Sequence, residues 1–173
     1  MSTGYEKYAT IQEAQAYFDC KLHEVAWSAA NPLEREPALI EATRIIDSLN
    51  FKGKKAVVYA YCLANPKATD AEIRAQAVTQ ELEFPRGADT TVPDRIKWAC
   101  FEIAYALLDG VDPQYELENM SMNDHGIGSV RASFNRSQVP QEHFMNGVPS
   151  ATAWKYLKPF LRDDKGLRMD RIS

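Results

Sequence analysis

The chain has 173 residues, of which 45% are hydrophobic, and it carries 20 Lys and Arg against 24 Asp and Glu, a formal net charge of −4. This length and composition suit one folded domain with a real hydrophobic core. The acidic balance argues against a protein whose main task is to coat phosphates. No charged leader followed by an apolar run opens the chain, and no stretch approaches a membrane span, so we expect no membrane contact.

The chain begins with two predicted helices. Thr10 and Glu13 match a capping box, in which each side chain satisfies a backbone N–H of the other residue. The apolar stripe that follows runs as far as Trp27, with room for a break near 19–21. A turn is expected at 31–36 and a helix at 37–49, because proline disrupts the interior of a helix and Pro37 therefore suits its start.

The next segment is predicted to hold a turn and a pair of helices. Gly53 is expected at a positive φ in a turn at 50–55, since glycine reaches that conformation without strain. Residues 56–64 are apolar almost throughout and predict a short buried helix. Thr69 with Glu72 forms a second capping box, which predicts a helix to about Leu82.

Residues 92–110 predict a central helix with both ends marked. Pro93 suits its first turn and Gly110 its C-terminal cap. Apolar residues at i, i+3 and i+4 form two opposed stripes, so the helix is expected to be buried on both sides. The second stripe is either more core or a contact between subunits. The stripes are Ile96, Cys100, Ile103 and Leu107, and, as candidate subunit contacts, Trp98, Phe101, Tyr105 and Leu108.

After Gly110 the sequence is broken by proline and glycine and shows no helical period up to residue 149. Within this arm 128–134 alternates like a strand, which needs a partner in its own loop or in another subunit. Val130 and Phe134 are further candidate contact residues. A closing helix is expected at 150–161, ended or kinked at Pro159, followed by a tail with too little apolar surface to fold alone.

The predicted fold class is mainly α: a helical bundle with a long irregular arm that carries a short β element, and an extended C-terminal tail. Four parts are expected, namely a helical core at 1–110, the arm at 111–149, the closing helix at 150–161 and the tail at 162–173.

The sequence offers no convincing catalytic, cofactor or metal site. Gly126 and Gly128 lack the third glycine of a phosphate-binding loop, and the three histidines are widely spaced. We therefore expect no enzyme activity, no cofactor and no metal. The three cysteines read as small buried groups. Tryptophans could stack the bases of a single strand, but each lies on or beside an apolar stripe, where aromatic residues usually serve packing. They are Trp27, Trp98 and Trp154.

The order of several weak motifs resembles the DnaT-like single-stranded-DNA-binding family found in tailed-bacteriophage genomes. The resemblance covers about 10–161. Residues 55–80 exceed the family's usual link, which implies an inserted helical pair, and Phe84 replaces a frequent tryptophan. The motifs are Ala16-Tyr17-Phe18, Trp27, the run Ala38 to Asp47, Phe51-x-Gly53-x-Lys55, Glu83-Phe84-Pro85-Arg86, Val92-Pro93, Ile127-Gly128-Ser129-Val130, Val148-Pro149-Ser150 and Leu157 to Leu161.

Members of this family look like head–tail connectors, and this resemblance implies a virion structural protein. The chain would form a ring of twelve copies that binds the portal, extends the DNA channel and offers a platform to a downstream tail protein. Double-stranded DNA would pass through the ring without specific binding. The protein would be assembled in the host cytoplasm and reside at the virion neck.

The tail is the predicted portal-docking segment in this interpretation, with apolar anchors and cationic partners. The alternative interpretation is a single-stranded-DNA-binding replication accessory protein, which the family label suggests. The candidate docking residues are Leu167, Arg168, Met169, Arg171 and Ile172.

Overall fold

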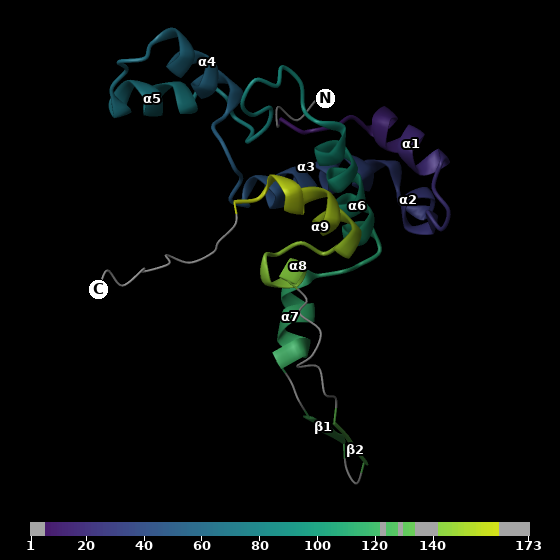
Figure 1. Ribbon diagram of the computed structural model, residues 1–173. Coiled ribbons are helices and arrows are strands. Elements are labelled where there is room, and N and C mark those ends of the chain that lie inside the picture. Colours follow the sequence, from purple (N-terminus) through teal and green to yellow (C-terminus); the bar gives the residue numbers. More distant parts are fainter. Residues whose placement is uncertain (1–5, 122–123, 128–129, 134–141, 163–173) are drawn as a thin grey trace, which may run out of the picture.

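The computed structural model describes residues 6–121, 124–127, 130–133 and 142–162. Over these residues the chain is mainly helical, which confirms the predicted fold class in its broad form (Figure 1). None of the helices in this part of the chain combines the length and apolar character needed to cross a bilayer. The elements are α1 (Ile11–Asp19), α2 (Val25–Ala29), α3 (Pro32–Asp47), α4 (Ala56–Ala64), α5 (Asp70–Ala77), α6 (Asp94–Leu108), α7 (Pro113–Ser121), β1 (Asp124–Ile127), β2 (Val130–Ser133), α8 (Glu142–Met145), α9 (Ala151–Leu157) and the 3₁₀ turn η1 (Lys158–Phe160).

Helix α6 lies at the centre of the fold and packs against α3 and α9, and to a lesser extent against α1 and α2. Its first predicted stripe is core, since Ile96, Cys100 and Ile103 are fully buried. Gly110 has a φ of 83° just after the last helical turn, as predicted. Pro93 precedes the first helical residue instead of belonging to the first turn.

The first helical region is divided, and α1 begins where the sequence predicted. The Thr10 hydroxyl accepts the Glu13 N–H at 3.2 Å, and the Glu13 carboxylate accepts the Thr10 N–H at 2.8 Å. These bonds satisfy two of the backbone donors that a helix start leaves without partners. The chain breaks between Asp19 and Val25, close to the expected position.

The prediction that the next helix starts at Pro37 is wrong, because α3 already begins at Pro32. Asn31 caps it: its side chain accepts the Leu33 N–H at 3.0 Å, and the Glu34 carboxylate accepts the Asn31 N–H at 3.3 Å. Pro37 removes one backbone hydrogen bond from the helix interior. This cost is offset by the cap and by the buried stripe further along α3.

Helix α4 has the predicted bounds, but the prediction that it is buried is wrong. Only Val58 is buried, because α5 is the helix that packs beside it and the pair projects from the body of the molecule (Figure 1). A helix that packs against a single other helix is buried on one face, and its other faces stay exposed. Helix α5 starts at the predicted Thr69 cap and ends at Ala77, short of Leu82.

The prediction that 111–149 lacks helix is also wrong. Helix α7 starts at Pro113, where the Asp112 carboxylate accepts the Gln114 N–H at 2.9 Å, and the short α8 follows later. The polar composition of α7 leaves only a weak apolar stripe, so periodicity does not reveal it. Between the two helices β1 pairs antiparallel with β2, with Ile127 opposite Val130.

Of the three cysteines expected to be buried, one is. Cys100 lies in the core, where burial raises the pKa of its thiol to about 12. Cys20 is exposed in the turn after α1, and Cys62 is partly exposed on the projecting α4. Their exposure follows from their positions, since Cys20 follows the last residue of α1 and Cys62 lies on a helix of which Val58 alone is buried.

Candidate nucleic-acid interface

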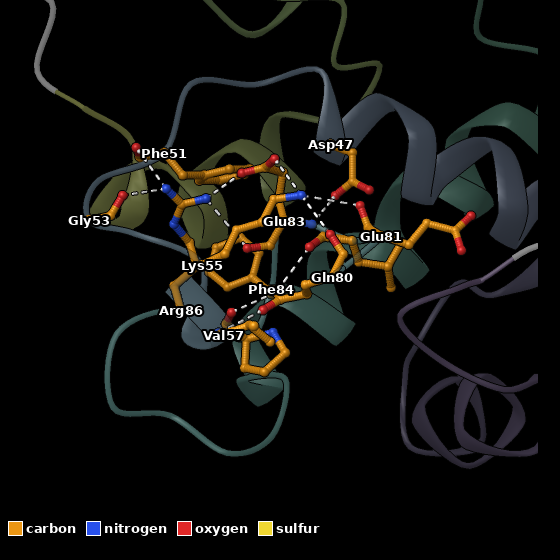
Figure 2. Close-up of polar contacts among 12 residues, drawn as sticks. Asp47, Phe51, Gly53, Lys55, Val57, Gln80, Glu81, Glu83, Phe84 and Arg86 are labelled. Carbon is orange, nitrogen blue, oxygen red and sulfur yellow. Dashed lines mark hydrogen bonds and ion pairs between the residues drawn. The ribbon is translucent and has the colours of Figure 1, made fainter. Parts of the chain in front are cut away.

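Two motifs that lie far apart in the sequence, the glycine turn and the Pro-Arg loop, meet at one junction (Figure 2). The Arg86 guanidinium donates to the Gly53 carbonyl at 2.6 Å and pairs with the Glu83 carboxylate. The Lys55 ammonium donates to the Gln80 carbonyl at 2.9 Å and lies 3.3 Å from Glu83. Both cations are therefore engaged within the chain, and their role is to hold the two loops together.

Beside this junction, the end of the described chain returns to the glycine turn and pairs with it. Phe51 lies opposite Leu161 in an antiparallel bridge. The Lys52 N–H donates to the Phe160 carbonyl at 2.8 Å, and the Arg162 N–H donates to the carbonyl of the residue before Phe51 at 3.0 Å. The turn and η1 are thus fixed side by side.

This pairing brings the backbones of a lysine, an aromatic residue and an arginine close together, through the bonds of Lys52 to Phe160 and of Arg162 to Asn50. Phe160 is the last residue of η1, and its ring meets the Phe84 ring with centroids 5.6 Å apart and planes at 90°. Lys52 and Phe160 border a hollow of about 260 Å³, whose floor includes Phe84 and Arg86.

An aromatic pair lies on α6 and α9, one helical turn before Phe160. Trp98 is 38% exposed, and its ring meets the Tyr156 ring with centroids 5.7 Å apart and planes at 62°. Ala153 and Leu157 of α9 are fully buried and α9 packs on α6. The packing of α9 on α6 therefore holds the pair in place.

Two exposed cations lie on the same two helices as this pair. Arg95 lies three residues before Trp98 and so shares its side of α6. Lys155 precedes Tyr156 on α9. Both side chains are exposed, and among the described residues neither is engaged in an ion pair. Lys158 is different, because its ammonium donates to Glu142 at 2.8 Å.

We call this set of side chains the aromatic face. It combines flat apolar rings with positive charge, which is what stacking of bases and attraction of phosphates require. Two carboxylates moderate its charge, Asp94 at the start of α6 and Asp89 at the hollow. The aromatic face comprises Trp98, Tyr156 and Phe160 with Arg95, Lys155, Lys52 and Arg162.

The other tryptophans are packing residues. Trp27 is fully buried and stacks on Phe18, with ring centroids 4.7 Å apart. Trp154 is 8% exposed and donates its indole N–H to Glu142 at 3.2 Å. Neither ring is open to a base, so Trp98 is the tryptophan that the structure leaves for stacking.

The structure places the predicted contact residues unevenly. Phe101 is buried within the chain itself, and Tyr105 and Leu108 are partly buried against the core. Val130 lies in β2, and Trp98 belongs to the aromatic face. The remaining predicted site residues lie outside the described residues: Phe134, Leu167, Arg168, Met169, Arg171 and Ile172.

Sequence reasoning missed the cationic members of the aromatic face and Phe160. No local sequence pattern indicates these residues, because Lys52 and Phe160 come together through the pairing of segments that are distant in the sequence. The cue that existed was the side of α6 that carries Trp98, where Arg95 recurs at helical spacing. Among the described residues, no cluster of three or more His, Cys, Asp and Glu side chains is placed to hold a metal.

Comparison with known proteins gives one family. The family described as "Putative DnaT-like ssDNA binding protein" matches residues 1–171. Neither the curated proteins nor the solved structures compared with the chain give a match.

This match corrects the interpretation of the chain as a head–tail connector. The family that matches is DnaT-like and single-stranded-DNA-binding, and not a head–tail connector family. The expectations that followed from the connector interpretation are overturned with it: the ring of twelve copies, the portal and downstream tail partners, and passive passage of double-stranded DNA.

Proposed function

The chain belongs to the family of DnaT-like ssDNA-binding proteins, and on that premise we propose that it binds single-stranded DNA through the aromatic face. The proposed role is binding without catalysis. The observation that carries it is the exposed Trp98 ring, held against Tyr156, with the exposed cations Arg95 and Lys155 on the same two helices.

Stacking supplies the sequence-independent part of the proposed interaction. Every base has a π-face, so an exposed ring accepts any of them, at about 1–3 kcal/mol per base. Trp98 lies on α6, and Tyr156 and Phe160 lie four residues apart on the α9–η1 segment. Unpaired bases are free to stack on such rings, whereas the bases of a duplex are stacked on each other and are not.

Charge supplies the second part. Arg95, Lys155, Lys52 and Arg162 are exposed and carry the positive charge that attracts a phosphate backbone. Because the whole chain carries a net charge of −4, the attraction is local. We therefore expect moderate affinity that falls as salt rises, with a slope set by these few contacts.

The core supports the face mechanically. We propose that α3, α6 and α9 act together as a small bundle whose packing fixes the rings before DNA arrives. A preformed site loses less side-chain freedom on binding than one that must be ordered first.

Anisotropy of a fluorescent oligo(dT) titrated with the full chain tests the proposal. Trp98→Ala is expected to weaken binding about 5- to 150-fold, which corresponds to the loss of one stacked base. Tyr115→Ala is the matched control, since Tyr115 is 61% exposed on α7, away from the face. Equal affinity of the Trp98 variant and the unchanged chain would contradict the proposed site, and no binding by any form would contradict the function.

A further inference from the structure

Helix α4 exposes an apolar surface that the proposed function does not use. Its nine residues, AVVYAYCLA, include no charged side chain, yet most of them face outward. Leu63 is 65% exposed, Val57 38% and Tyr59 37%. Exposed apolar residues gathered on one element commonly mark a surface that another segment covers.

This surface is hollowed. A groove of about 620 Å³ runs between α4 and the loop that follows Pro85, with Tyr59 and Leu63 on one wall and residues 87–90 on the other. Gly87 and Asp89 border both this groove and the hollow at Phe160. The two depressions are therefore adjacent.

The described chain ends beside these depressions. Leu161 is bridged to Phe51, and the Arg162 N–H is bonded to the turn that leads into α4. At least 11 residues follow Arg162 in the sequence. An extended chain of that length reaches about 36 Å, whereas α4 is about 14 Å long, so the segment can reach the whole groove.

The residues that follow match the groove chemically. Leu167, Met169 and Ile172 supply apolar side chains for a groove whose α4 wall is uncharged. Asp89 is the acidic residue of the groove lining, and Arg168 and Arg171 offer it opposite charge. Asp163 and Asp164 come first, where the exposed Lys52 and Lys54 of the turn lie close to the start of the segment.

We propose that residues 163–173 fold back along the groove and cover the apolar surface of α4, with Leu167, Met169 and Ile172 seated between α4 and the 87–90 loop. The occupant is this chain's own C-terminal segment, and the contact does not depend on DNA. Covering the groove would remove apolar side chains from water, which stabilises the contact.

Site-directed photo-crosslinking in the full chain tests this. The crosslinker p-benzoylphenylalanine is placed at Leu63, and peptides joined by irradiation are identified by mass spectrometry. The expected product joins position 63 to a residue within 163–173 of the same chain. Leu22, 83% exposed in the turn between α1 and α2, is the control position and should give no such product.

Mixing isotope-labelled and unlabelled chains separates the outcomes. Joined peptides within one chain support the proposal, whereas joined peptides between chains overturn it in favour of a second copy as the occupant. Yield at the level of the Leu22 control also overturns it. Replacing Leu167, Met169 and Ile172 together by Ser should reduce the crosslinking yield to that of the control, whereas Lys165→Ser should leave it unchanged. A yield that the triple replacement does not change, or that Lys165→Ser abolishes, would contradict the proposed contact of the three apolar side chains with the groove.

Discussion

The Lys21 ammonium donates hydrogen bonds to both carboxylate oxygens of Glu102, at 2.6 and 2.7 Å, in the interior of the molecule. Glu102 is 4% exposed on the central helix α6, and the Tyr17 hydroxyl donates a further bond to it at 2.6 Å. A buried carboxylate requires such partners, because burial removes the water that would stabilise its charge. The turn after α1 is thereby joined to α6.

We expect Lys21→Met to lower the free energy of unfolding by about 3 kcal/mol, because it leaves the Glu102 charge buried without its counter-ion. Chemical denaturation followed by circular dichroism measures the change. Lys97→Met is the control: Lys97 pairs with Glu13 at the surface, and that loss should cost less than about 1 kcal/mol. A similar loss in the free energy of unfolding for both variants would show that the Lys21–Glu102 pair contributes no more to stability than a surface pair.

Arg86→Lys is expected to destabilise the junction of the glycine turn and the Pro-Arg loop by about 1–2 kcal/mol. A guanidinium can donate to several carbonyls in fixed directions from a planar group, whereas the compact ammonium of lysine cannot reproduce them. Arg86 donates to the carbonyls of Lys52 and Gly53 at 2.9 and 2.6 Å. Thermal unfolding of this variant should be compared with that of Arg74→Lys, at an exposed position of α5, which should leave stability unchanged.

We expect the stability of the start of α1 to depend on pH through the carboxyl group of Glu13. The hydrogen bond from Lys97, followed by the one from the Thr10 backbone, lowers the pKa of this carboxyl to about 2. A lowered pKa stabilises the fold above the ordinary value of 4.5, and this contribution is lost as the pH falls through about 2. Carboxyl titration by NMR should show a higher pKa for Glu13 in Lys97→Met.

Glu72 is an internal control for that titration. The Thr69 backbone and hydroxyl lower its pKa within the second capping box, without a lysine. Its titration should therefore be unaffected by Lys97→Met. A Glu13 titration that does not move in the variant would contradict the role given to Lys97.

Salt dependence tests the charges of the aromatic face. Arg95→Ala and Lys155→Ala should each weaken oligo(dT) binding and reduce the slope of log K against log salt by about 0.7, since each would remove one phosphate contact to a single strand. Arg74→Ala removes an exposed positive charge elsewhere and should leave the slope unchanged. Equal slopes in all three variants would show that the phosphates pass elsewhere.

Much of the local structure follows from short-range chemistry that a sequence displays directly. The capping boxes at Thr10 and Thr69 and the positive φ of Gly53 and Gly110 occur where they were predicted. Each depends on residues within three or four positions of one another. Pro37 shows the limit of such reasoning, because a cap at Asn31 and burial along α3 outweigh a local preference.

By itself, the sequence determined that the chain is mainly helical, where the central helix lies and that one of its sides is core, because these follow from periodicity and capping along one segment. Only the tertiary structure decided which aromatic residues are exposed. Trp27 and Trp98 both lie on apolar stripes, yet Trp27 is fully buried and stacks on Phe18, while Trp98 is 38% exposed beside Tyr156. Exposure depends on what other segments cover, and pairings such as Lys52 with Phe160 join residues that no local pattern connects.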